Sequence, residues 1–264
     1  MCQLLGVSSD SPAQWSGVME AFGQQGGATA DNPDGWGVAW RETAEWHLHK
    51  APEAASTSLR FDRLTQELRT QLLIAHVRKA NPVTAHVPRN THPFLRTCRG
   101  RQWVFAHNGK LPEILHPEGC CHPRLSRSLG ETDSEHAFCF LLDEIASVFA
   151  DDAICSQSFW LQTVVQLSDS IARQGQFNFL MSDGTYLLAY GHDRLYRSRS
   201  YRDDHSILLI ASAPLTQDAA WESFRPGELL VARNGEVVTV LQRRRAGREV
   251  ARQALSQWRC SGCR

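Results

Sequence analysis

The chain has 264 residues, enough for one large domain or two small ones with a sizeable hydrophobic core. Lysine and arginine total 28, and aspartate and glutamate also total 28, so the formal net charge is zero. This balance argues against a protein that binds nucleic acid or an anionic membrane surface through its overall charge. With 42% hydrophobic and 21% charged residues, the composition predicts a folded globular protein and excludes a disordered one.

Neither end of the sequence predicts a membrane or export segment. No apolar run approaches the roughly 20 residues that cross a bilayer. The first 15 residues have neither the positive start nor the apolar stretch of a signal peptide. We therefore expect a cytoplasmic protein. The exception to the even charge is a basic C-terminal tail over 243–264, for which we expect a helical or partly disordered segment.

The first half of the chain predicts two helices among short strands. Residues 11–27 predict a helix opened by a Ser–Pro pair and closed by a Gly–Gly pair. Residues 35–51 predict two strands around a short turn, and 60–69 predict a second helix. Apolar runs over 72–78 and 102–109 predict buried strands, and the latter runs into an Asn–Gly turn signal.

The second half predicts two adjacent helices and then strands again. Residues 131–150 have apolar side chains at helical spacing, with Thr132 and Glu135 as a candidate capping pair and Cys139 as a packing residue. Residues 158–175 predict a second helix. Hairpins with Asp–Gly and Asn–Gly turns follow. Two sheets packed face to face with helices outside would satisfy this order, as one α+β domain over 1–242.

Cys2 raises the question of chemistry at the front of the chain. If Met1 is removed, Cys2 carries a thiol and a free α-amine. An α-amine has a pKa of about 7.7–8.0 and a free thiol one of about 8.5, so the amine can accept the thiol proton. Nucleophile and general base would then share one residue. The alternative is a small apolar residue entering a buried strand.

Four further stretches carry polar groups that chemistry could use. Arg78 ends a strand and could bind a carboxylate with both arms of its guanidinium, or form a surface ion pair. His92 precedes a proline and could equally be structural. Asn108 and Gly109 could stabilise an oxyanion through a side-chain amide and a main-chain N–H, or form an ordinary turn. Asp133 could bind a substrate ammonium or simply cap a helix.

Together and in this order, these blocks resemble the class II glutamine amidotransferases. The pattern is an N-terminal cysteine, then H-x-R-x-A, N-x-H-P, H-N-G and a T-D-S-E helix start, read here as MCQLLG, AHVRKAN, NTHPF, FAHNGKL and GETDSEHAF. With DGWGVAW and FNFLMSDG, the sequence looks most like the stand-alone YafJ-type branch, and the resemblance runs to about residue 238. It implies an N-terminal nucleophile hydrolase with a four-layer αββα sandwich.

The resemblance also implies a role for each residue. Cys2 would attack the γ-carboxamide of glutamine or a γ-glutamyl amide, and its own α-amine would carry the proton. Asn108 and Gly109 would stabilise the oxyanion. Arg78 would hold the substrate α-carboxylate, and Asp133 its α-ammonium. The intermediate would be a γ-glutamyl thioester, which water hydrolyses to glutamate with release of ammonia or an amine.

Two histidines complete the implied site. His92 and His107 correspond to histidines of the family blocks, and we expect only supporting, substrate-orienting roles for them. The resemblance implies no metal and no organic cofactor. The partner is then a small-molecule substrate, with neither nucleic acid nor membrane.

The sequence departs from the synthase-linked members beside the implied pocket. Lys79 stands where those members often have an aromatic residue, and Asn81 replaces a threonine, so the two differences bear on the choice of substrate. The ammonia-accepting domain of those members has no counterpart here. The ammonia would pass to a separate acceptor subunit, or the enzyme would simply hydrolyse a γ-glutamyl bond. The alternatives are a γ-glutamyl conjugate hydrolase that does not act on free glutamine, and a non-catalytic regulatory subunit of the same fold.

Two cysteine clusters leave a zinc module as a further alternative. Cys120, Cys121 and His122 form one cluster, and Cys260 and Cys263 form the other. A structural zinc site needs four ligands, and nothing in the sequence places the two clusters side by side. We therefore expect loop and tail cysteines, kept as thiols because no export signal is present.

Overall fold

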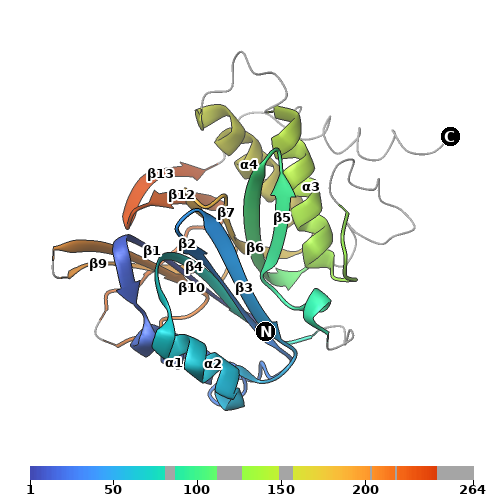
Figure 1. The fold of residues 1–264 in the computed structure, drawn as a ribbon. Coiled ribbons are helices and arrows are strands. Elements are labelled where there is room, and N and C mark those ends of the chain that lie inside the picture. Colours follow the sequence, from blue (N-terminus) through green and yellow to red (C-terminus); the bar gives the residue numbers. More distant parts are fainter. Residues whose placement is uncertain (81–86, 112–126, 149–156, 203, 218, 243–264) are drawn as a thin grey trace.

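The computed structural model describes residues 1–80, 87–111, 127–148, 157–202, 204–217 and 219–242. Two antiparallel sheets pack face to face, with helices outside each, as Figure 1 shows. The prediction of two packed sheets with outer helices is confirmed. Cys120, Cys121, His122, Cys260 and Cys263 lie outside the described residues, as does the basic tail.

The larger sheet has seven strands, and the first strand of the chain lies in its middle. In spatial order the strands are β11 (Glu222–Ser223), β9 (Tyr196–Arg202), β10 (His205–Ala211), β1 (Gln3–Gln14), β4 (Arg69–Val77), β2 (Trp36–Glu42) and β3 (Glu45–Ala51). Helices α1 (Ser16–Gln24) and α2 (Leu59–Glu67) pack on its outer face, with a short 3-10 turn at Ala55–Thr57.

The smaller sheet has six strands. In spatial order they are β13 (Glu236–Gln242), β12 (Glu228–Arg233), β8 (Leu187–Gly191), β7 (Gln176–Ser182), β6 (Arg101–Lys110) and β5 (Phe94–Cys98). Helices α3 (Asp133–Val148) and α4 (Gln157–Ala172) cover its outer face (Figure 1). A second 3-10 turn lies at Pro88–Asn90.

The central strands read as continuous apolar runs because both of their faces are buried. Side chains alternate between the two faces of a strand. Leu4 and Ile74 therefore lie in the cluster between the sheets, whereas Leu5 and Leu73 pack toward α1 and α2. On the other sheet, Phe105 packs on α3 with its ring stacked 5.0 Å from that of Phe138. Each sheet thus separates two apolar layers, which gives the four-layer arrangement.

The predicted helix over 11–27 was wrong at its start. The strand β1 continues to Gln14, and α1 begins at Ser16. A register shift between Ser8 and Ala13 lets the chain rejoin β4, where Ala13 pairs with Thr70. Pro12 is tolerated inside that irregularity, because a bulge needs no N–H donor from the ladder there.

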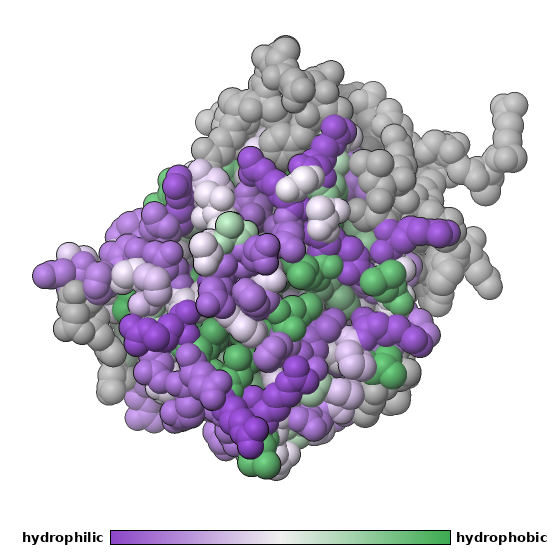
Figure 2. Space-filling view, viewed as in Figure 1, coloured by the Kyte–Doolittle hydropathy of each residue, from purple (hydrophilic) through white to green (hydrophobic). Residues whose placement is uncertain are grey.

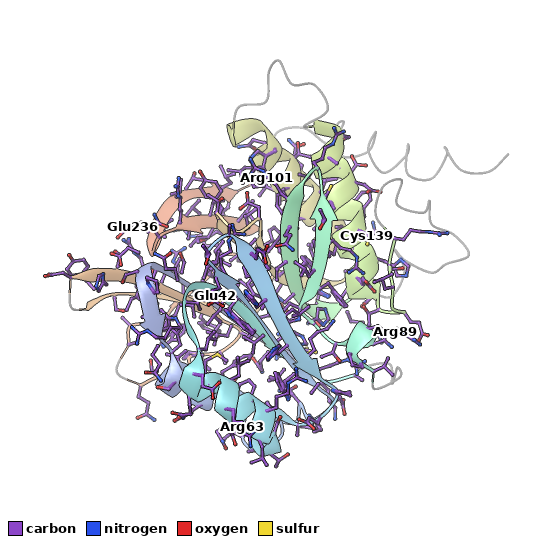
Figure 3. The ribbon with its side chains drawn as sticks, in the orientation of Figure 1. Glu42, Arg63, Arg89, Arg101, Cys139 and Glu236 are labelled. Atoms are coloured by element: carbon purple, nitrogen blue, oxygen red, sulfur yellow. The ribbon has the colours of Figure 1, made fainter. Side chains whose placement is uncertain are left out.

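The start of α3 confirms one half of the predicted capping pair. Thr132 Oγ1 accepts a hydrogen bond from Glu135 N at 3.2 Å. The Glu135 carboxylate does not return to the cap, but accepts from Leu129 N and Gly130 N and pairs with Arg96. Cys139, which is labelled in Figure 3, is fully buried in this helix, so its predicted packing role is confirmed.

One face of the described residues is mainly polar (Figure 2). The face in Figure 2 is largely hydrophilic, with apolar side chains in small patches. Within the described part of the chain, no helix is both long and apolar enough to cross a membrane.

Candidate active site

Cys2 stands where β1 begins, beside the end of β4. Gln3 pairs with Val77 and Leu4 with His76, so Cys2 lies next to Arg78 on the adjoining strand. By alternation, its side chain shares the inner face of the sheet with Leu4. The Sγ atom accepts a hydrogen bond from Lys79 N at 3.2 Å, and the thiol can donate to Lys79 O at 3.4 Å. One thiol is thus fixed between the sheets at the end of the strand pair.

The surroundings of Cys2 act on its pKa in opposite directions. Burial raises the pKa of the thiol above its ordinary value, whereas the Lys79 N–H, the chain's amino terminus and the Arg78 guanidinium lower it. Burial dominates, so the thiol remains protonated at neutral pH unless a nearby base takes the proton. A nucleophile at this position therefore needs a local general base.

Arg78 is buried, with 4% of its surface exposed, and its main chain is fixed to the loop before β2. Arg78 N donates to Gly35 O at 2.8 Å, and Asp34 N donates to Arg78 O at 3.0 Å. The Asp34 carboxylate accepts from Ala80 N at 2.7 Å. Burial lowers the pKa of the guanidinium, and the charges of Cys2 and Asp34 oppose that effect. The sequence interpretation missed Asp34, although its DGWG motif was part of the resemblance.

Asn108 is buried on β6 and reaches across to the other sheet. Its Nδ2 donates to Ser212 Oγ at 3.0 Å, and the same oxygen accepts from Leu4 N at 3.0 Å. Asn178 Nδ2 donates to Asn108 O at 3.2 Å. Ser212, which the sequence interpretation also missed, thereby ties the Asn108 amide to the first strand, two residues beyond Cys2.

Gly109 follows Asn108 at a point where the chain admits no side chain. A Cβ atom on Gly109 would lie 1.9 Å from Gln176 O of the neighbouring strand β7. This carbonyl also contacts the ring of His107, whose Nε2 lies 3.0 Å away. Glycine is therefore required by a close approach of two main chains.

His107 and Asp133 lie at the junction of β6 and α3, not beside the thiol. His107 Nδ1 lies 2.8 Å from Ser134 Oγ, and burial lowers the pKa of its imidazole. One Asp133 oxygen accepts from Leu111 N at 2.8 Å and the other from Ser134 N at 2.7 Å. Asp133 thus fixes the start of α3 to the strand that carries Asn108 and Gly109.

His92 is buried against a second histidine, His76 of β4. Their ring centroids are 4.3 Å apart. Among the described residues, neither ring nitrogen of either histidine has a hydrogen-bond partner. Burial lowers the pKa of His92 well below its usual value, and it lowers that of His76 to about 3. Both imidazoles are neutral in the folded protein at neutral pH.

The structure brings Cys2, Arg78 and Asn108 to one end of the layer between the sheets, with Gly109 beside Asn108. Asp133 lies at the adjoining strand end with His107, which contacts Ser134 of α3, whereas His76 and His92 pack against each other. Within the described ranges, no group of three or more histidine, cysteine or acidic side chains is arranged to hold a metal ion.

The family model of the class II glutamine amidotransferases matches residues 1–200 and 197–256. The chain belongs to this family. A Haemophilus influenzae protein named provisionally as a glutamine amidotransferase is 29% identical over 90% of this chain and 86% of its own. The similarly named YafJ of Escherichia coli is 31% identical over 86% of this chain and 96% of its own.

The comparison with solved structures agrees with this family assignment. A solved structure from Pseudomonas aeruginosa, named for the same activity on provisional grounds, has a TM-score of 0.66 and 29% identity, covering 90% of this chain and all of that one. The αββα arrangement is thus that of the N-terminal nucleophile hydrolases. A more distant relative, 24% identical over 82% of this chain and 83% of its own, is the γ-glutamyl-hercynylcysteine sulfoxide hydrolase of Mycobacterium tuberculosis.

Proposed function

We propose that this amidotransferase-family protein hydrolyses the γ-carboxamide of glutamine, or a γ-glutamyl amide, through a thioester on Cys2. The observation that carries the proposal is a partly buried thiol beside Arg78, at the same end of the sandwich as an Asn108 amide that Ser212 holds. Nucleophile, carboxylate-binding group and oxyanion donor then lie at one end of the layer between the sheets.

The general base forms beforehand, when hydrolysis of the Met1–Cys2 peptide bond removes Met1, which is 47% exposed, and frees the α-amine of Cys2. The free α-amine of Cys2 takes the thiol proton, and the thiolate attacks the γ-carbonyl carbon. The carbonyl oxygen becomes an oxyanion, stabilised by Asn108 Nδ2 and Gly109 N. Because burial raises the pKa of Cys2, a base on the same residue serves the reaction directly.

The intermediate then collapses. The C–N bond breaks, the protonated amine returns its proton to the leaving ammonia or amine, and a γ-glutamyl thioester remains. Water, deprotonated by the same amine, attacks this thioester and releases glutamate with the Cys2 thiol. In this proposal the residues named carry out every step, without a metal ion or an organic cofactor.

Two charged residues hold the substrate backbone. Arg78 binds the α-carboxylate with both arms of its guanidinium, and Asp133 receives the α-ammonium. The Asp133 carboxylate also accepts hydrogen bonds from the main-chain N–H groups of Leu111 and Ser134. His92 and His107 orient these elements without exchanging protons with the substrate.

The proposal has two candidate leaving groups, ammonia and the amine of a larger γ-glutamyl amide. Lys79 pairs with Asp31 at 2.8 Å beside Cys2, where synthase-linked members often have an aromatic residue. The mycobacterial relative is named for a γ-glutamyl conjugate, so a larger γ-glutamyl amide is the second candidate substrate. Free ammonia would otherwise pass to a separate acceptor subunit.

The test is the intact mass of the untagged protein before and after reaction with a glutamine-like diazoketone. We expect loss of Met1 and one adduct on Cys2, together with glutamate release from glutamine. Loss of Met1 without an adduct would favour a γ-glutamyl conjugate, to be found by screening such compounds. Retention of Met1 would remove the base and overturn the mechanism.

A further inference from the structure

Asn178 is a buried asparagine to which the proposed reaction gives no role. It lies on β7, where it pairs directly with Asn108 of β6, and 2% of its surface is exposed. Strand alternation places its side chain on the inner face of the sheet with Leu180, which belongs to the cluster between the sheets. A buried side-chain amide needs partners for both its N–H donors and its oxygen.

The side chain of Asn178 has a partner for each of these groups. Its Oδ1 accepts from three consecutive main-chain N–H groups in the turn between β8 and β9, those of His192 at 2.8 Å, Asp193 at 3.0 Å and Arg194 at 3.2 Å. Its Nδ2 donates to Asp193 Oδ1 at 2.7 Å and to Asn108 O at 3.2 Å. A flipped amide would face two oxygens with an oxygen, so these contacts fix which atom is the donor.

The contact with Asn108 O bears on the proposed oxyanion site. Asn108 O and Gly109 N belong to the same peptide unit, and the bond between the two residues is trans. In a planar trans peptide the C=O and the N–H point in opposite directions. Because Asn108 O points toward Asn178 on β7, the Gly109 N–H points to the opposite side of β6.

Within the described residues, no strand lies opposite Gly109 on that side. The neighbour of β6 there is β5, whose first residue, Phe94, pairs with Phe105, four residues before Gly109. The sheet ladder therefore does not use the Gly109 N–H, which suits a donor to a developing oxyanion. The direction of this N–H depends on the plane of the peptide, and Asn178 Nδ2 contacts that peptide at its carbonyl end.

We propose that Asn178 is a positioning residue of the oxyanion site, which acts through the Asn108–Gly109 peptide. The inference rests on the proposed reaction. The hydrogen bond from Asn178 Nδ2 to Asn108 O fixes the peptide plane, so that the Gly109 N–H faces the substrate oxygen as negative charge develops there. The same hydrogen bond polarises the peptide, which strengthens its N–H as a donor.

The two proposed oxyanion donors thus have separate supports. Ser212 Oγ accepts from the side-chain amide of Asn108, whereas Asn178 contacts the main-chain peptide that supplies the Gly109 N–H. The loss of one support leaves the other donor in place. A variant at Asn178 should therefore lose part of the activity and not all of it.

The variant N178D isolates the donation to Asn108 O. It keeps the shape of the side chain and an oxygen for the three N–H groups of the turn, but a carboxylate oxygen replaces the Nδ2 donor. We expect kcat for glutamate release to fall at least about tenfold, with KM changed by less than about threefold, because the oxyanion forms only in the transition state. D193N is the matched control, since it keeps an oxygen acceptor for Asn178 and leaves the contact with Asn108 in place. Its kcat should equal that of the wild type.

A second variant covers the case in which repulsion between two carboxylates unfolds N178D. In N178D/D193N the new amide can donate to the new carboxylate, whereas the donor to Asn108 O is still absent. Circular dichroism and thermal unfolding show whether each variant is folded. Nuclear magnetic resonance of the Gly109 amide gives a readout that does not depend on turnover. Its nitrogen resonance should shift further in both N178D proteins than in D193N, because the peptide loses the hydrogen bond at its carbonyl.

Three results would overturn the proposal. The first is a folded N178D or N178D/D193N protein with the kcat of D193N. The second is a raised KM with unchanged kcat, which would assign Asn178 to binding of the ground-state substrate. The third is a Gly109 resonance that moves no further in the N178D proteins than in D193N. If wild-type protein released no glutamate from any γ-glutamyl amide, the proposed reaction would fail, and the Gly109 resonance would still decide whether Asn178 orients this peptide.

Discussion

Ser212 Oγ lies 3.0 Å from Asn108 Nδ2, and this contact joins the two sheets at the proposed oxyanion site. The same hydroxyl accepts from Leu4 N, so a single side chain fixes the amide relative to the strand of the nucleophile. In the proposed reaction Ser212 is therefore a positioning residue, which acts through Asn108.

Replacing Ser212 by alanine should lower kcat about tenfold with a small change in KM, because the Asn108 amide loses its orientation in the transition state. Leu4 N would lose its buried acceptor, so the free energy of unfolding should fall by about 1–3 kcal/mol. Ser168→Ala removes a comparable buried hydroxyl from α4 and is the control. Equal effects of both variants on kcat would contradict a positioning role.

Replacing Cys2 by alanine should abolish glutamate release while leaving thermal unfolding nearly unchanged. The matched control is Cys98→Ala, since Cys98 is a buried free thiol on β5. An N-terminal tag that cannot be removed should inactivate the enzyme equally, because it converts the α-amine into an amide. Measurable turnover in either the Cys2→Ala or the tagged protein would rule out the proposed nucleophile and base.

Replacing Arg78 by lysine should raise KM for glutamine about tenfold or more, with a smaller effect on kcat. A point charge replaces the two-armed guanidinium, so the α-carboxylate is held less well in both ground and transition states. Steady-state kinetics on glutamine and on an analogue that lacks the α-carboxylate measure how much the carboxylate contributes to KM and to kcat. The variant should discriminate between these compounds less than the wild type does, and undiminished discrimination would count against this role.

Replacing Gly109 by alanine should both destabilise the protein and abolish activity, since the new Cβ would lie 1.9 Å from Gln176 O. The neighbouring main chain cannot yield as a flexible side chain would. Gly17 of α1 is the control, because nothing lies within 4 Å of a Cβ built there. Gly17→Ala should stabilise the protein by up to about 1 kcal/mol, through the better helix propensity of alanine. Chemical denaturation measures both effects.

Stability should fall as the pH decreases from about 6.5 to 5. The pKa of His76 is about 3 in the folded protein against about 6.5 when unfolded, so the unfolded chain binds the proton first in this window. At 1.36 kcal/mol per pH unit, His76 alone contributes a loss of about 2 kcal/mol by pH 5. His92, whose pKa is also lowered, acts in the same direction.

Urea denaturation at several pH values measures this slope. His76→Phe should flatten the slope, whereas exposed His205 offers a control: His205→Gln should leave it largely intact. An unchanged slope in His76→Phe would show that His76 binds its proton equally in the folded and unfolded protein, against a lowered pKa.

Local patterns in the sequence predicted most of the fold. The central strands are buried on both faces, so they occur as continuous apolar runs that predict strands. The start of α1 was missed because Ser11 and Pro12 imitate a helix start, whereas the pairing of Ala13 with Thr70 is decided by a strand distant in sequence. The Glu135 carboxylate was assigned to the cap for the same local reason. Its actual partners, including Arg96, depend on tertiary packing.

The site residues that the sequence predicted are those that lie in short sequence motifs. Cys2, Arg78, Asn108 and Gly109 belong to such blocks, and the sheets bring them to one end. Ser212 could not be identified, because its value lies in contacts with Leu4 and Asn108, 208 and 104 residues away. Asp34 donates its main-chain N–H to Arg78 O, and a local motif does not predict a contact with a residue 44 positions away.

The placement of β1 between β4 and β10 has a consequence for the order of folding. Leu5–Ser9 of β1 pair with Ile207–Ala211, and Leu4 N donates to Ser212, 208 residues further along the chain. The strand that follows Cys2 therefore gains its second neighbour only when residues 207–212 are in place. Contacts this distant in sequence fold slowly compared with those of a sheet built from neighbouring hairpins.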